Sequence, residues 1–329
     1  MSTLTPARPS LRGPARVVVR QHRWALRIAG GLALVALLGL IALALRSTHV
    51  AEVFEASDCR VDGADGNRAC MQTARNYLDS MFTYRGVFED FALALMALPV
   101  LLSGYVAGPL IARELENGTF RLSWTQSVSP ARWLATRLAV PAVLVLAWTA
   151  VLSAGLHWAR SGSDLPYPAE WYTMYVFTTT GTVLAGHVLL GLCVGALIGI
   201  LVRRTLLALA LSALVTGVVG VSFAGLRARL WPPSTVTGTT LDVRENIWWV
   251  ETGHLTGTGE RLPQDVCAQA VSESARTRCF ADNDITGHYL DYHPASHFWP
   301  LQLVETGILL ALAAVAVAVA FRVLRRRTG

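Results

Sequence analysis

Long apolar blocks separated by polar stretches dominate the chain. About 20 mostly apolar residues are needed to cross a bilayer as a helix. Six segments reach or approach that length: Ile28–Leu45, Phe91–Ala112, Leu138–Trp158, Val176–Val202, Leu206–Leu226 and Phe298–Phe321. They lack the polar stripe of helices in a soluble bundle. The pattern therefore predicts an all-α polytopic membrane protein with six transmembrane helices.

Two details of this pattern need interpretation. Arg203 and Arg204 interrupt a run of about fifty apolar residues. Because two arginines at a helix centre are costly, we expect a tight turn there that separates two helices. The first segment could instead be a cleaved signal peptide, but its apolar stretch and the residues before it are long for one. We favour an uncleaved helix.

Composition supports the membrane interpretation. Of the 329 residues, 53% are hydrophobic and only 15% are charged, with a mean hydropathy of +0.43. Soluble domains carry about 25% charged residues, so an ordinary soluble enzyme is excluded. The high apolar content also excludes a disordered chain.

The arginines indicate a topology. With a cytoplasmic N-terminus, the inside segments hold 16 arginines and two acids, and the outside segments hold 12 arginines and 19 acids. Positive charge is concentrated on the cytoplasmic side of membrane proteins. We therefore expect both termini in the cytoplasm and the protein in the plasma membrane.

This topology divides the chain. Residues 1–27 form a basic cytoplasmic tail, either an interfacial helix or a plain positive anchor. Residues 28–226 hold the first five helices, with an outer loop at 46–90 and a cytoplasmic loop at 113–137. An extracellular loop (227–297), the last helix (298–321) and a second basic tail (322–329) follow.

Cysteine positions agree with the expected topology. Cys59 and Cys70 fall in the first outer loop, and Cys267 and Cys279 in the last one. Paired cysteines outside suit an oxidising exterior. We expect disulfides within each loop, although pairing across the loops or free thiols remain alternatives. Cys193 lies in the fourth apolar segment, where it serves as a small buried side chain.

The cytoplasmic loop is the most informative stretch of the chain. Asn117-Gly118 is a helix-stop signal, and Ser129-Pro130 is typical of a new helix start. Between them lie Phe120, Leu122 and Trp124, spaced among polar residues. Exposed aromatic side chains favour a docking surface, the alternative being a lipid-facing linker.

This loop resembles the one after the second helix of actinobacterial type-two ABC exporter permeases. The shared pattern is an acidic residue, Gly-Thr, Trp-Thr-Gln-Ser and Arg-Trp-Leu. The matching residues are Glu114, Glu116, Gly118, Thr119, Trp124, Thr125, Gln126, Ser127, Arg132 and Trp133. Three further stretches are similar to the same family: Arg20–Ala25, Gly195–Ser212 and His293–Gly307.

The resemblance implies that this loop docks on an ABC ATPase subunit, and that two six-helix permeases, identical or not, form the transport unit. It assigns eight residues to or near the ATPase contact: Glu114, Glu116, Gly118, Thr119, Phe120, Arg121, Trp124 and Gln126. The chain has no Walker A motif and no dinucleotide fingerprint. We therefore expect no enzyme activity and no bound cofactor in this chain, with ATP and Mg²⁺ on the partner, membrane lipids around it, and no nucleic-acid partner.

Two ionisable residues lie inside predicted helices. Glu305, about two turns into the last helix, is either a gate or substrate contact, or a structural carboxylate paired with an arginine. His187 in the fourth helix serves either a proton relay or one interhelical hydrogen bond. Glycines at 181, 186, 191, 195 and 199 recur along that helix and predict close packing against another helix of this chain or of a second subunit.

The last outer loop holds four histidines: His254, His288, His293 and His297. A zinc site is conceivable, since His293 and His297 are four residues apart, but Pro294 interrupts a helical pairing and no HExxH occurs. A disulfide-stapled cap without a metal is favoured. The resemblance implies short re-entrant helices before the last helix, with Pro294 and Pro300 as breakers.

The leading hypothesis is an ATP-driven exporter permease for a small amphipathic molecule, a lipid or a peptide. A non-transporting membrane sensor or immunity protein of the same fold is the main alternative. A membrane-embedded enzyme is a third, disfavoured because metal and nucleophile signatures are missing.

Overall fold

The computed structural model describes residues 20, 23–62, 67–119, 129–161, 167, 169–241 and 246–328. Six helices in this part are long and apolar enough to cross a membrane, as the apolar pattern predicts. The chain divides into two compact units. The first comprises residues up to 169, 174–221 and 306 onward; the second comprises 170–173 and 222–305.

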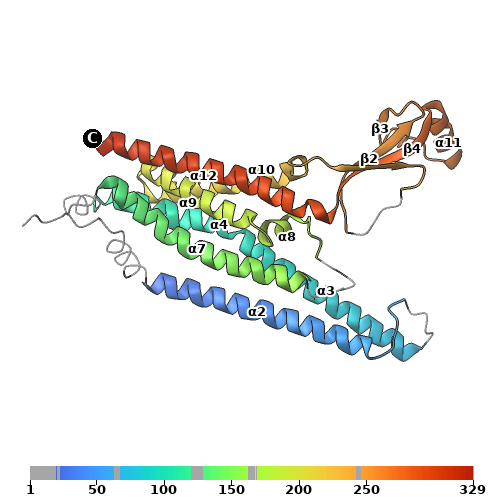
Figure 1. Ribbon diagram of the computed structural model, residues 1–329, viewed down its shortest axis with the longest axis horizontal. Coiled ribbons are helices and arrows are strands. Elements are labelled where there is room, and N and C mark those ends of the chain that lie inside the picture. The colour runs from blue at the N-terminus through green and yellow to red at the C-terminus, as the bar shows by residue number, and fades with distance from the viewer. Residues whose placement is uncertain are drawn as a thin grey trace, which may run out of the picture. The chain divides into compact units, whose positions relative to one another are not determined.

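Most of the first unit is helical (Figure 1). Its elements are α2 (Arg23–Glu55), α3 (Arg68–Met96), α4 (Leu98–Leu101), the π-helix η1 (Leu102–Ala107), α5 (Gly108–Glu116), α7 (Pro130–Ser161), α8 (Met174–Thr179), α9 (Val183–Val202), most of α10 (Thr205–Leu226) and the C-terminal part of α12 (Phe298–Thr328). Helix α2 packs on α3 and α7, and α9 packs on α7, η1 and α5. The predicted interfacial helix of the N-terminal tail lies almost wholly outside the described residues.

The predicted turn at the two arginines is confirmed. Helix α9 ends at Val202, α10 begins at Thr205, and Arg203 between them adopts a left-handed conformation with φ of 56°. The cost of burying the two guanidinium groups in a helix is avoided by this break.

The predicted fourth helix, Val176–Val202, is wrong as one continuous element. It is broken at Thr180–Thr182 into α8 and α9. The hydroxyls of Thr178, Thr179 and Thr180 each donate to the carbonyl four residues back, at 2.7 Å. Such back-bonding competes with the helical ladder and bends helices, and a glycine follows directly. Ser153 Oγ donates to the freed carbonyl of Gly181 at 3.2 Å.

The glycine ridge of α9 packs within this chain. A Cβ at Gly191, Gly195 or Gly199 would lie 2.7–2.9 Å from atoms of α4, η1 or α5. At Gly186 it would lie 3.1 Å from Leu309 of α12. The row of small residues along α9 thus serves contacts within this chain, because glycine lets two backbones approach this closely.

The second unit corrects the all-α prediction. A four-stranded antiparallel sheet in the order β1-β4-β2-β3 lies in the last predicted outer loop (Figure 1). The stretch around Pro294 and Pro300, where re-entrant helices were expected, forms the 3₁₀ turn η3 (Ala295–His297) and the start of α12. Its strands are β1 (Ser234–Gly238), β2 (Trp248–Thr256), β3 (Arg261–Pro263) and β4 (Ile285–His293), and α11 (Glu273–Asp282) precedes β4. Aromatic and β-branched residues between Gly-, Asp- and Pro-containing turns favour strands. Pro300 lies in the first turn of α12 rather than breaking a helix, since a first turn does not need its N–H.

A buried tryptophan anchors the segment 170–173 in the second unit. Trp171 is only 1% exposed, and its indole N–H donates to the carbonyl of Asn246 at 3.2 Å. Its ring packs edge-on against Trp248 and Phe298. These contacts give the unit an aromatic core beside its sheet.

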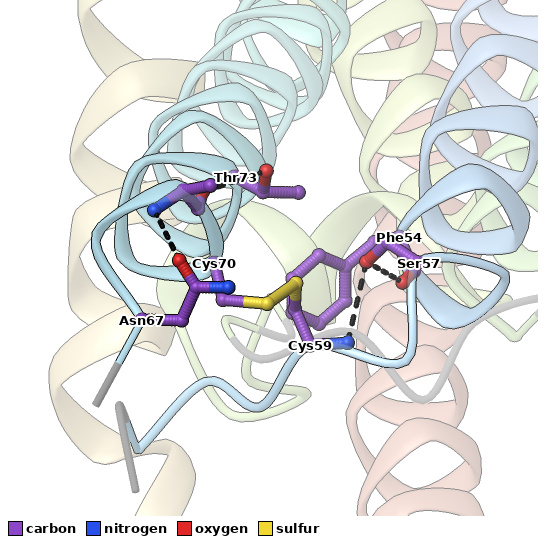
Figure 2. Close-up of a disulfide and its surroundings, with 7 residues drawn as sticks. Phe54, Ser57, Cys59, Asn67, Cys70 and Thr73 are labelled. Carbon is purple, nitrogen blue, oxygen red and sulfur yellow. Dashed lines mark hydrogen bonds between the residues drawn. A yellow bond between two sulfur atoms is a disulfide. The ribbon is translucent and has the colours of Figure 1, made fainter. Parts of the chain in front are cut away.

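Both predicted disulfides are present. Cys59–Cys70 joins the end of α2 to the start of α3, and Cys267–Cys279 joins a turn to α11. Figure 2 shows the first bridge beside Asn67, whose side chain accepts from the Ala69 N–H and caps α3. Just along the two helices, Phe54 and Tyr77 stack with ring centroids 4.1 Å apart. The bridge and the stacked rings hold the two helix ends together.

Candidate functional site

The loop singled out by the sequence leaves the first unit at the end of α5. Helix α5 ends at Glu116, Asn117 caps it, and Gly118 has a φ of +69°. A side chain is strained in this left-handed conformation, whereas glycine adopts it readily. The predicted stop signal at Asn117-Gly118 is therefore confirmed. Thr119 donates to the Glu114 carbonyl at 3.4 Å.

Glu114 connects α5 to the beginning of α7. One carboxylate oxygen accepts a hydrogen bond from the indole N–H of Trp133 at 2.9 Å, and the other pairs with the Arg137 guanidinium. The side chains of Glu114 and Arg137 are only 16% and 12% exposed. Partial burial strengthens charge-assisted hydrogen bonds. Glu114 thus fixes α7 relative to the residue where the loop departs.

Glu116 connects the same helix to α10. Its Oε2 accepts from both the backbone N–H and the hydroxyl of Thr205, at 3.0 and 2.6 Å. The first N–H groups of a helix lack partners within it and favour negative charge nearby. The carboxylate therefore caps α10 from a position 89 residues earlier in the chain.

These contacts define a helix-end junction, made of Glu114, Glu116, Trp133, Arg137 and Thr205. Through Trp133 the junction is continuous with a buried apolar cluster, which consists of Ile111, Trp133, Leu134, Ala196, Ile200, Ala320 and Leu324. Arg327 at the end of α12 donates to the Ile200 carbonyl at 2.7 Å. Five helix ends therefore meet here: those of α5, α7, α9, α10 and α12.

Sequence reasoning found only part of this junction. Glu114, Glu116, Gly118 and Thr119 lie at it, whereas Phe120, Arg121, Trp124 and Gln126 lie outside the described residues. Arg137 and Thr205 were not predicted. Arg137 could have been predicted, because it lies four residues after Trp133 and therefore on the same helix face. Nothing local links Thr205 to Glu116.

His187 lies against a membrane-embedded cavity. The imidazole is 5% exposed and borders a space of about 200 Å³ between α4, α8, α9 and α10. Thr178, Thr216 and Met96 also line this space. On a neighbouring face, Thr216 donates to Ser103 Oγ, which donates to the Ser212 carbonyl. A polar strip therefore runs beside the π-helix.

Glu305 is paired with an arginine, one of its two expected roles. Arg227 donates through Nε and Nη2 to the two carboxylate oxygens, at 2.7 and 3.0 Å. Both side chains are almost completely buried. Such a two-pronged pair offsets the cost of burying either charge alone.

The four histidines form two close pairs. His254 and His288 face each other across β2 and β4 with Nδ1 atoms 3.1 Å apart. His293 and His297 approach to 3.0 Å, because the 3₁₀ turn at Ala295–His297 brings them together despite Pro294. In the residues that the structure describes, no three His, Cys, Asp or Glu side chains are grouped to hold a metal.

Comparison with known proteins addresses the first unit above all. Residues 29–227 match the model of a family described as ABC-2 membrane transporter related. The match covers more than half of the chain and ends at Arg227, before the sheet. No curated protein and no solved structure matches. With six apolar helices and this match, the chain is a multi-pass membrane protein that belongs to the ABC-2 membrane transporter related family.

Proposed function

We propose that the protein is the permease subunit of an ATP-driven exporter, and that it moves a small amphipathic molecule, a lipid or a peptide out of the cell. A separate ABC ATPase supplies the energy. The observation that carries this proposal is the helix-end junction. The loop between α5 and α7 starts and ends where Glu114 and Glu116 tie three helices together. A push on that loop would therefore reach α5, α7 and α10 at once.

The proposal divides the eight predicted loop residues into two roles. Phe120, Arg121, Trp124 and Gln126 would contact the ATPase, with Trp124 as the apolar anchor. The other four, Glu114, Glu116, Gly118 and Thr119, would position the loop. The carboxylates of Glu114 and Glu116 already bind partners within this chain. The loop and both termini would then face the cytoplasm, as the arginine distribution predicts, and a second permease would complete the transport unit.

The test uses the full chain co-expressed with its ATPase and reconstituted in vesicles. Trp124→Ala should weaken co-purification, because an anchor tryptophan contributes about 2 kcal/mol or more to an interface. Glu114→Gln should leave binding largely intact but lower ATPase turnover coupled to the permease. Trp249→Ala is the matched control, since Trp249 is exposed in the sheet of the second unit.

The outcomes distinguish a transporting permease from a non-transporting sensor. Loss of complex with Trp124→Ala but not with Trp249→Ala supports docking through the loop. Unchanged binding and turnover in both loop variants would refute it. A stable complex whose ATPase never drives substrate across the vesicle membrane would favour the sensor alternative.

A further inference from the structure

The first half of α2, the last turns of α3 and the second half of α7 enclose an apolar groove, to which α4 and η1 each add a leucine. The groove has a volume of about 500 Å³, within the range of about 300–1,000 Å³ typical of small-molecule sites. Leu32 and Ala36 of α2, Phe91 of α3, and Trp148 and Leu152 of α7 are among its lining residues. We call this space the tail groove. Its walls suit a hydrocarbon chain.

A smaller pocket of different chemistry follows on the same three helices. It measures about 40 Å³, room for roughly three water molecules. Ser47, Tyr84 and Arg160 line it together with Tyr167 and apolar side chains. We call it the head pocket.

Arg160 gives the head pocket its charge. Its Nε atom is buried and has no hydrogen-bond partner in the part of the chain that the structure describes. Two neighbouring arginines already have partners. Arg85 pairs with Glu89 at 2.8 Å, and Arg46 donates to the Tyr84 hydroxyl at 3.1 Å. A buried guanidinium donor without an acceptor is costly. An anionic oxygen in the pocket would remove that cost.

The order of the two spaces matches the shape of a lipid. Along α2 the tail groove spans positions 29–40 and the head pocket positions 43–47. The apolar stretch of α2 ends at Leu45, and Arg46 and Ser47 follow. A buried cluster that includes Leu40, Phe88 and Leu156 lies at the change from one space to the other. The cationic pocket is therefore near a membrane surface, and the apolar groove extends toward the bilayer centre.

We propose that α2, α3 and α7 bind one anionic phospholipid, with its phosphate on Arg160 in the head pocket and an acyl chain in the tail groove. The planar guanidinium matches phosphate oxygens well. Because the helix-end junction takes no part in it, this site goes beyond the proposed transport function and does not depend on an ATPase.

The experiment measures lipid selectivity of the full chain in nanodiscs or mixed micelles. Phosphatidylglycerol and phosphatidylcholine of the same acyl chains are offered at equal amounts, and bound lipid is counted by native mass spectrometry. Both lipids carry a phosphate, but only phosphatidylcholine would place a quaternary ammonium beside the Arg160 guanidinium, so the wild type should retain phosphatidylglycerol preferentially. Arg160→Gln should reduce retention of phosphatidylglycerol about tenfold or more, the value of a hydrogen bond to a charged group. It should also lower the preference over phosphatidylcholine, because the cationic side chain is gone. Arg75→Gln is the matched control, an exposed arginine of α3.

Two further arms separate the sources of binding. Ala36→Phe should fill the tail groove and reduce retention of both lipids while Arg160 stays in place. Inorganic phosphate should fail to displace the lipid, because it lacks the chain. An unchanged preference in Arg160→Gln, an equal loss in Arg75→Gln, or full displacement by phosphate overturns the proposal. Should Arg160→Gln not fold, Ala36→Phe decides it alone, and unaltered retention in that variant counts against the site.

Discussion

At the scale of single residues, backbone conformation and charge pairing explain the positions that matter most. Gly118 lies at a φ of +69° with open space around its Cβ position. Its role is therefore conformational rather than steric. Arg227 and Glu305 are the opposite case, since their buried side chains are held as an ion pair.

We expect Gly118→Ala to lower the free energy of unfolding by about 1 kcal/mol, because alanine is strained in the left-handed region. Gly86→Ala is the control. Gly86 lies within α3 with nothing near its Cβ position, so that substitution should be neutral or stabilising. Thermal unfolding of the detergent-solubilised protein measures both. Equal behaviour of the two variants would contradict the conformational role of Gly118.

We expect Glu305→Leu alone to destabilise the protein by about 3–5 kcal/mol, because it removes the carboxylate that pairs with the buried Arg227 guanidinium. The double variant Arg227→Met/Glu305→Leu should recover most of that loss, since both charges are then gone. Denaturation midpoints of the wild type, both single variants and the double variant measure this. A double variant as unstable as the sum of the singles would show that the two side chains act independently.

At the scale of elements, local patterns predict helices well and fail where long-range contacts decide. Apolar length alone locates the six long helices, and Arg203-Arg204 locates the turn between α9 and α10. The break at Thr180–Thr182 depends on side chains of other helices. Ser153 donates to the Gly181 carbonyl, and Thr306 shares a hydrogen bond with the Thr182 hydroxyl. The sheet was missed because an expectation from family resemblance outweighed the strand composition of β2 and β4. At the candidate site, Gly118 was predictable from its dipeptide, but the pairing of Glu116 with Thr205 was not.

At the scale of the whole molecule, the second unit holds both histidine pairs. Burial lowers the pKa of His293, and the nearby His297 lowers it further, although the hydrogen bond to the Ala228 carbonyl acts in the opposite direction. That bond places a proton on Nε2 and leaves Nδ1 to face His297 Nδ1. A second proton on His293 would set two donors against each other.

We expect the second unit to lose stability as pH falls below about 6.5, the usual histidine pKa. The unfolded chain then binds a proton that folded His293 resists, so acid favours unfolding. Hydrogen exchange in β4, corrected for its intrinsic pH dependence, should show less protection at pH 5.5 than at pH 7.5. His293→Gln should reduce this difference and His157→Gln, on exposed α7 surface, should not. An undiminished pH effect in His293→Gln would assign it to other groups.

The buried pair also has a consequence for biosynthesis. Glu305 follows Arg227 by 78 residues, and all four strands of the sheet lie between them in the sequence. A chain emerging from the ribosome therefore carries Arg227 without its counter-ion until the start of α12 is made. Because domains complete in order of synthesis, docking of α12 is the step that neutralises this charge. A ribosome-stalled chain that ends before residue 305 should remain an unfinished intermediate, recognisable to the membrane quality-control machinery by its uncompensated arginine.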